Sequence, residues 1–179
     1  MRTISVAMLL LALVGCAKLM GTPPGGPQVG DKLIDVELQT LDGKKAMLSD
    51  FTRGRVAIVD FSESWCSWCT REVGDLNEIA KAFPADKVVI VQVDSGEDAK
   101  RVEADRAANK TAFPTLLDPD FKAAIRYDVR VIPDLLIVGH DGTVLTRTGY
   151  ADAAKIRRLI EPAVKAMEAA GGKAKDTGK

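Results

Sequence analysis

Hydrophobic positions in the middle of the chain follow two different periods. Residues 56–61 and 88–93 are short, mainly apolar runs rich in branched side chains, which predicts two buried strands. Between them apolar residues recur at helical spacing, and a proline ends the predicted helix: Val73, Leu76, Ile79, Ala80, Phe83, then Pro84. Charged residues are expected to cover the opposite, solvent-facing side of this helix: Arg71, Glu72, Asp75, Glu78, Lys81.

Turn and helix-end signals extend the pattern in both directions. Two β-hairpins are predicted, each from an Asp-Gly pair between two short apolar segments. The first has Asp42-Gly43 between 36–39 and 46–48, and the second has Asp141-Gly142 between 135–138 and 143–146. A charged helix is predicted at 97–109, and a second helix from Asp118-Pro119 to about Tyr127. A last, amphipathic helix is predicted from Asp152 onward, and Pro162 should kink or split it. The order strand–helix–strand–helix predicts parallel strands with crossover helices. The fold class is therefore α/β, with a mixed central sheet and helices on both faces.

The first residues have the pattern of a secretory signal. Arg2 is the only charge before Lys18, and 4–14 is an apolar run broken only by Ser5, too short to span a bilayer. The small residues before Cys16 resemble the lipobox of bacterial lipoproteins, which implies cleavage before Cys16 and its acylation. The alternatives are an ordinary signal peptide, or a buried helix with a chance cysteine.

This interpretation divides the chain into four parts. Residues 1–15 are the signal peptide, 16–30 the lipidated cysteine with a Gly/Pro-rich linker, 31–170 one folded domain, and 171–179 a disordered tail. The expected location is extracytoplasmic, at a bacterial membrane, where disulfides persist.

Composition narrows the possible chemistry. Among 179 residues, 46% are hydrophobic, and 25 basic side chains balance 25 acidic ones, so nothing electrostatic indicates nucleic acid as a partner. The chain has three cysteines and one histidine, and a four-ligand zinc site would have to use nearly all of them. With Cys16 assigned to a lipid and His140 in a predicted hairpin turn, no metal site is expected.

The remaining two cysteines lie in Trp65-Cys66-Ser67-Trp68-Cys69, directly after a predicted strand and at the start of a predicted helix. This placement puts Cys66 at the helix N-terminus and Cys69 one turn on, where free amides and the helix dipole favour a thiolate. Thiol–disulfide exchange is the function that this arrangement favours. Half of a zinc site, a purely structural disulfide and a chance pair are the alternatives.

These motifs resemble the thioredoxin superfamily, and more closely the membrane-tethered TlpA/ResA-type thiol–disulfide oxidoreductases. The likeness covers about 29–164 and rests on the first hairpin at 29–50, the strand and motif at 59–69, the segment at 127–133 and the hairpin at 135–144. The resemblance implies a thioredoxin-like three-layer sandwich with an added N-terminal hairpin, and an insertion at about 95–127.

The resemblance also implies roles for particular residues. Cys66 would be the nucleophile and Cys69 the cysteine that resolves the mixed disulfide, with Asp60 as a buried proton acceptor rather than a solvent-facing acid at the strand end. Pro133 would be cis rather than an ordinary trans proline, and Ile132 and Trp65 would contact the substrate.

Two further positions leave questions open. Ser67-Trp68 stands where the family often has a proline before the second cysteine. This departure leaves open the reduction potential of the pair and whether the protein reduces or oxidises its substrates. Glu63 is either a solvated loop acid or a charge that disfavours the thiolate.

The sequence thus predicts a lipid-anchored thiol–disulfide oxidoreductase that reduces proteins and has no cofactor beyond its own Cys66–Cys69 disulfide. Its expected partners are protein thiols and disulfides, apocytochromes c by family analogy, a membrane thiol electron donor, and the membrane itself. A Sco-like copper chaperone and an oxidising dithiol protein are the alternatives. A peroxidase is disfavoured because residues 62–66 lack the Pro-x-x-x-Thr/Ser-x-x-Cys pattern.

Overall fold

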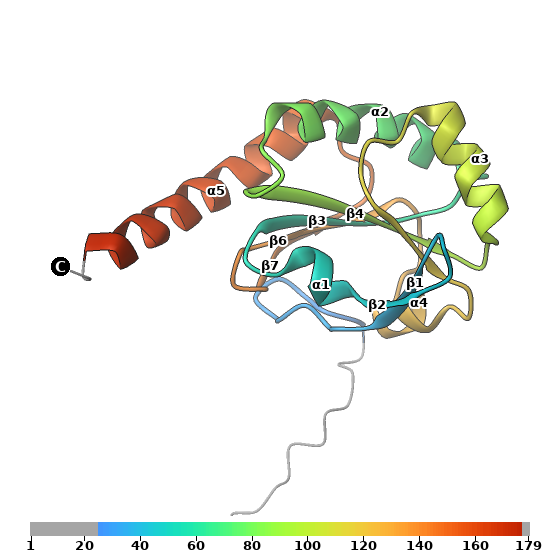
Figure 1. Cartoon of the computed structure of the whole chain (residues 1–179), viewed down its shortest axis with the longest axis horizontal. Helices are drawn as coiled ribbons and strands as arrows, with labels where there is room; N and C mark the ends of the chain where they lie inside the picture. The colour runs from blue at the N-terminus through green and yellow to red at the C-terminus, as the bar shows by residue number, and fades with distance from the viewer. Residues whose placement is uncertain (1–24, 177–179) are drawn as a thin grey trace, which may run out of the picture.

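The computed structural model of the protein describes residues 25–176, with side chains described to residue 170 (Figure 1). The predicted signal peptide, Cys16 and most of the predicted linker lie outside the described residues.

Strands of the described chain form one seven-stranded sheet in the order β2-β1-β5-β4-β3-β6-β7. The strands are β1 Glu37–Thr40, β2 Lys45–Met47, β3 Val56–Ser62, β4 Val88–Ser95, β5 Thr115–Asp118, β6 Asp134–Val138 and β7 Val144–Thr148. Strands β3, β4 and β5 are parallel, and the two hairpins add antiparallel strands at the two edges. The mixed sheet with an added N-terminal hairpin is confirmed.

Helices cover both faces of this sheet, as predicted (Figure 1). Helices α2 Ser67–Ala82, α3 Ala99–Asn109 and α5 Ala153–Asp176 lie on one side, and the short helices α1 Leu48–Thr52 and α4 Lys122–Arg126 lie on the other. Side chains of β3 alternate between the two sides, with Ile58 facing α2 and α5, and Val59 and Phe61 facing the opposite core.

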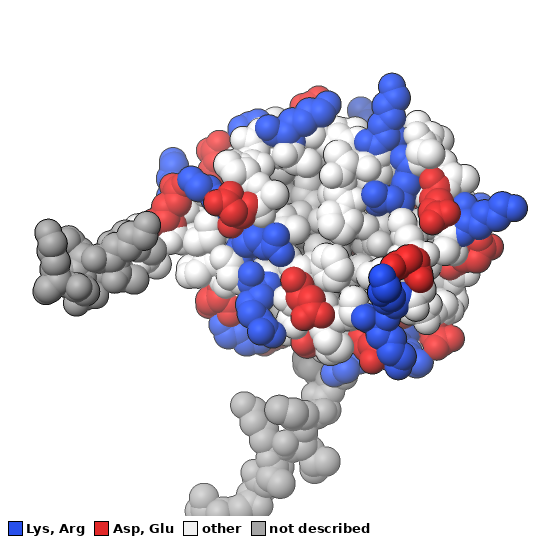
Figure 2. Space-filling view, in the orientation of Figure 1, with Lys and Arg blue, Asp and Glu red and all other residues white. Residues whose placement is uncertain are grey.

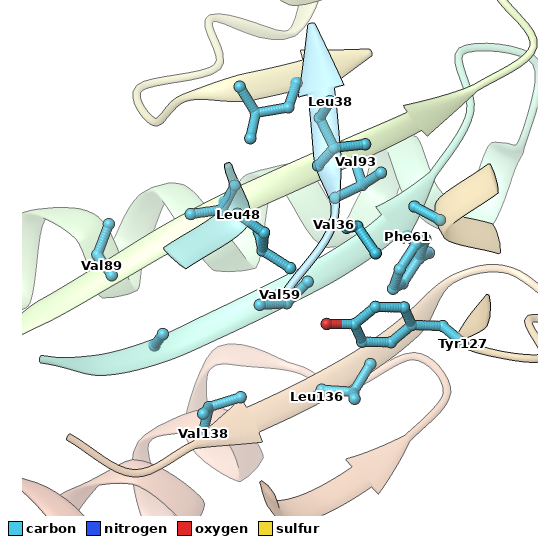
Figure 3. Packing of buried hydrophobic residues seen from close by; sticks show 14 of the residues in the cluster. Val36, Leu38, Leu48, Val59, Phe61, Val89, Val93, Tyr127, Leu136 and Val138 are labelled. Atoms are coloured by element: carbon cyan, nitrogen blue, oxygen red, sulfur yellow. The ribbon is translucent and has the colours of Figure 1, made fainter. Parts of the chain in front are cut away.

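The core on the α1 and α4 side joins the N-terminal hairpin to the rest of the sheet (Figure 3). Tyr127 is fully buried there, with its ring 5.0 Å from that of Phe61 and its hydroxyl donating to the Ile34 carbonyl. Leu38 and Leu48 pack into the same cluster. The hydroxyl partner removes the cost of burying a polar tip, so Tyr127 can contribute its whole ring to the core.

Two elements were not predicted, and one boundary was wrong. Strand β5 and helix α1 are too short to show a clear period in the sequence. The helix expected from Asp118-Pro119 begins only at Lys122, because Asp118 ends β5 and its carboxylate accepts hydrogen bonds from Ala124 N (2.9 Å) and Ser95 Oγ (3.3 Å). Asp118 therefore bonds to the first turn of the helix, as a capping residue does, but three residues of turn lie between it and the start of α4.

Of the two effects predicted for Pro162, a kink or a split, the split does not occur, since α5 runs continuously through this residue. Pro162 is exposed, whereas Ile156, Ile160 and Val164 are buried against the sheet. The proline therefore lies on the solvent side, where water can satisfy the freed carbonyl while the packed face holds the helix together. Helix α5 also extends over 171–176, part of the predicted tail.

Candidate active site

Cys66 and Cys69 lie where β3 passes into α2. The Cys66 amide donates to the Glu63 carbonyl (3.1 Å), which closes the turn after β3, and Cys66 is the N-cap of α2. The two cysteines form a disulfide with 5.2 Å between their Cα atoms, and the Cys69 amide donates to Cys66 Sγ (3.1 Å). An amide at a helix N-terminus that points at a sulfur stabilises that sulfur as a thiolate once the pair is reduced.

The two sulfurs differ in access. Cys66 retains 7% of its surface and Cys69 1%, and only Cys66 lines an open cleft of about 570 Å³. Apolar side chains form much of the cleft wall: Trp65, Trp68, Phe121, Val131, Ile132. A substrate in this cleft meets Cys66 first, which fits the roles that the resemblance implied for the two cysteines.

The loop before β6 closes the other side of the cysteine pair. The Ile132–Pro133 bond is cis, as expected, and Cys66 Sγ lies 3.9 Å from the Ile132 carbonyl oxygen. Arg147 of β7 anchors this loop, because its guanidinium forms an ion pair with Asp134 and donates to the Tyr127 carbonyl (2.8 Å). The loop is thus fixed at both ends, with the backbone at Ile132 facing the reactive sulfur.

Asp60 is fully buried in β3, on the sheet face that α2 covers. Among the residues that the structure describes, neither carboxylate oxygen has a hydrogen-bond partner. Burial has the largest effect and raises the pKa of Asp60 well above its ordinary value, and the charges of Glu72 and Asp134 raise it further. The side chain of its register partner Gln92 lowers this pKa, but by less. The solvent-facing alternative for Asp60 is wrong, because the side chain is fully buried.

Glu72 is a second buried acid, which the sequence prediction placed on the solvent side of α2. It is fully buried instead, because one carboxylate oxygen accepts from the Ala151 amide (2.7 Å) in the loop that leads to α5. Burial raises the pKa of Glu72 to about 7. The spacing from Cys69, one helical turn, could have shown that the two residues share a face.

Trp68 connects the first turn of α2 to the same loop. Its ring centroid lies 5.3 Å from that of Tyr150, and the Arg71 guanidinium lies over both rings, 5.6 Å from Trp68 and 5.5 Å from Tyr150. The Tyr150 hydroxyl donates to Asp75 (2.9 Å). The residue that replaces the usual proline is therefore part of an aromatic and cationic stack beside the disulfide.

Other sequence candidates have simpler surroundings. His140 lies in the turn between β6 and β7 and is half-buried. Glu63 is partly buried in the cleft wall, which raises its pKa, so it is not a fully solvated loop acid. Among residues 25–176, no cluster of three or more His, Cys, Asp or Glu side chains is arranged to hold a metal ion.

Charges of both signs alternate over the face drawn in Figure 2. No helix in the described part of the chain has the length and apolarity needed to cross a bilayer.

Comparisons with known proteins agree with this geometry. Residues 29–147 match the family model described as AhpC/TSA family. The chain is similar to the thiol-disulfide oxidoreductase ResA of Geobacillus thermodenitrificans, 29% identical over 146 residues, which cover 80% of this chain and 83% of the relative. It is also similar to the thiol:disulfide interchange protein CycY of Rhizobium leguminosarum bv. viciae, 34% identical over 122 residues, 68% of this chain and 63% of the relative.

A similar crystal structure is that of a protein from Chlorobium tepidum assigned as a thiol:disulfide interchange protein DsbE. It has a TM-score of 0.70 and 26% identity, and the match covers 78% of this chain and 99% of the other. The thioredoxin-like fold is thereby shown.

Proposed function

This chain belongs to the AhpC/TSA family and is a thiol–disulfide oxidoreductase, and from that premise we propose that it acts as a reductase of protein disulfides outside the cytoplasm, anchored to a membrane through Cys16. The observation that carries the proposal is the position of Cys66 Sγ. It lies at the N-terminus of α2, 3.1 Å from the Cys69 amide, and lines the open cleft.

The reaction starts from the reduced pair. The Cys66 thiolate attacks one sulfur of the substrate disulfide, so that a Cys66–substrate disulfide forms and the other substrate sulfur leaves as a thiolate. Cys69 then gives up its proton and attacks Cys66 Sγ, which breaks the mixed disulfide. Two electrons have passed to the substrate, which leaves as a dithiol, and the enzyme holds the Cys66–Cys69 disulfide.

Asp60 is our candidate acceptor for the Cys69 proton. It lies buried on the sheet face beneath α2, the helix that carries Cys69, and its raised pKa makes it a base strong enough to take a proton from a thiol. Glu72 lies on the same helix face as Cys69, and its charge acts directly on Asp60. The charge on Glu72 therefore raises the affinity of Asp60 for a proton.

The substrate would bind as an extended segment across the cleft. The Ile132 backbone beside Cys66 can pair with such a segment, while Trp65, 64% exposed, offers an apolar contact. Apocytochrome c cysteines are the proposed substrates by analogy, and a membrane dithiol protein is the proposed electron donor that reduces the pair again.

The reduction potential of the Cys66–Cys69 pair tests the direction. The pair is equilibrated with glutathione or dithiothreitol buffers and followed by the fluorescence of Trp65 and Trp68. A value near about −270 mV supports a reductase, and a value near about −120 mV would show an oxidant instead. Cys69→Ser should trap a mixed disulfide with a substrate protein, and Cys66→Ser should abolish it. A pair that fails to cycle would overturn the proposal as a whole.

Anchoring has its own test. Cells that express the full chain are labelled with a palmitate analogue, and the membrane fraction is collected. Label and membrane association should both disappear in Cys16→Ser. Equal labelling of the two forms would refute the lipid anchor without affecting the proposed chemistry.

A further inference from the structure

The segment that connects β3 to Cys66 is held by the side chain of Glu97, which lies two residues before α3. Ser64, two residues before Cys66, donates twice to the Glu97 carboxylate. Its backbone amide reaches Oε2 (2.7 Å), and its hydroxyl reaches Oε1 (2.7 Å). One acid thus takes both donors of one loop residue, a two-point attachment that fixes orientation as well as position.

Arg101 completes the attachment. Its Nε donates to the Ser64 hydroxyl oxygen (2.8 Å) and forms an ion pair with Glu97 Oε1 (2.5 Å). The side chain of Glu97 is only 8% exposed, so water competes little for these bonds. Asp98 caps α3 by accepting from the Arg101 amide (3.0 Å), which sets the helical turn that brings Arg101 back over Glu97.

Asp94 adjoins this cluster from the end of β4. It is the register partner of Ser62, is buried, and has one carboxylate oxygen without a partner among the described residues. Burial, and then the charge and hydrogen bond of Glu97, raise the pKa of Asp94 to about 9, with further contributions from Glu63 and Asp105. At neutral pH Asp94 is therefore protonated and can donate to Glu97, which stays ionised.

We propose that Glu97, with Arg101 and Ser64, is a positioning cluster for Cys66. It fixes the turn after β3 so that Cys66 Sγ stays against the Cys69 amide and faces the Ile132 carbonyl. The proposal rests on the proposed exchange reaction at Cys66. It assigns Glu97 no contact with substrate or with the reacting sulfurs.

Electrostatics alone would not explain a carboxylate at this place. A negative charge near a thiol disfavours the thiolate, so Glu97 as a bare charge would slow Cys66. Its two bonds to Ser64 have the opposite effect, because they keep Cys66 at the helix N-terminus, where the thiolate is stabilised. A misplacement of about 1 Å can cost roughly a hundredfold in rate. The two explanations therefore predict effects of opposite sign when Glu97 is neutralised.

The test uses the full chain in its reduced form. The rate of Cys66 alkylation by iodoacetamide is measured from pH 5 to pH 9 in Glu97→Gln, Ser64→Ala and the double variant. Glu103→Gln is the matched control, since Glu103 is an exposed acid in α3, the helix that begins two residues after Glu97. We expect Glu97→Gln to react roughly tenfold more slowly at pH 7, with its pH profile shifted to higher pH, and Glu103→Gln to match the wild type.

Coupling between the two residues is the second readout. If Glu97 acts through Ser64, the double variant should lose no more than the larger single loss, and Ser64→Thr, which keeps both donors, should retain the rate. Faster alkylation in Glu97→Gln, or additive losses in the double variant, would overturn the proposal. Urea unfolding of each oxidised variant identifies any that fail to fold, and Ser64→Ala then carries the test.

Failure of this inference can be told apart from failure of the proposed function. Alkylation needs no protein substrate, so unchanged profiles refute the positioning cluster even in an active reductase. A wild-type chain that reduces no disulfide refutes the proposed function, whatever the profiles show.

Discussion

Glu72 contributes to the pH dependence of the stability of the oxidised protein, and Glu72→Gln should remove that contribution. Burial raises the pKa of Glu72 from 4.5 to about 7. One pKa unit corresponds to about 1.4 kcal/mol, so ionised Glu72 lowers the free energy of unfolding by roughly 3 kcal/mol. The folded state holds this proton more tightly than the unfolded chain does. The penalty is therefore absent below about pH 4.5, grows as the pH rises, and is complete above about pH 7.

The substitution Glu72→Gln also lowers the free energy of unfolding by an amount that does not change with pH. A glutamine amide oxygen can still accept from the Ala151 amide, but its NH₂ group takes the place of a carboxylate oxygen that has no partner among the described residues. A buried unpaired donor costs about 1–3 kcal/mol at every pH. The diagnostic quantity is therefore the difference between two pH values, in which this constant cost cancels.

Urea unfolding of the wild type and Glu72→Gln at pH 4 and pH 8, with the disulfide intact, measures this difference. The variant should gain roughly 3 kcal/mol relative to the wild type between the two pH values. Relief of the repulsion on Asp60 acts in the same direction. Glu78→Gln, an exposed acid on the same helix, should show no comparable gain. A gain below about 1 kcal/mol, or a loss, would refute the assignment of Glu72 as a buried acid with a raised pKa.

Three other substitutions test neighbouring parts of the site. Asp60→Asn should prolong the mixed disulfide about a hundredfold at pH 7 by removing the acceptor for the Cys69 proton, as followed by acid-quenched gels; wild-type decay would exclude that role. Asp94→Asn should become more stable relative to the wild type as the pH rises from 4 to 9, because ionisation of Asp94, whose pKa is raised to about 9, lowers the free energy of unfolding of the wild type. A difference in the free energy of urea unfolding that stays the same at all pH values would contradict this. Arg147→Leu should lower the free energy of unfolding by about 3–5 kcal/mol, since it leaves Asp134 buried without its partner; a loss under about 1 kcal/mol would show that the ion pair does little.

Local patterns predicted the parts of the fold that have a clear period or a strong stop signal. Strands β3 and β4, helix α2 and both hairpins begin or end within about two residues of their predicted positions. Strand β5 was missed because four residues between a loop and a proline carry too little pattern. Whether Pro162 splits α5 could not be read from the sequence, because it depends on which side of the helix meets water, and the packing of Ile156 and Ile160 decides that.

The sequence by itself determined the chemistry. Two cysteines separated by two residues, at the junction of a buried strand and a helix, favour thiol–disulfide exchange, and Asp60 in an apolar strand indicates a perturbed acid. These inferences need only local geometry, since strand and helix periods already place the side chains.

Only the tertiary structure decided which other groups lie around those cysteines. Glu72 looks like a surface residue until the loop before α5 covers it, and Glu97 meets Ser64 across 33 residues of chain. The identity of such partners depends on how distant elements pack. Burial and pairing, which set pKa values and hold the reactive turn, are properties of that packing and not of any short stretch of sequence.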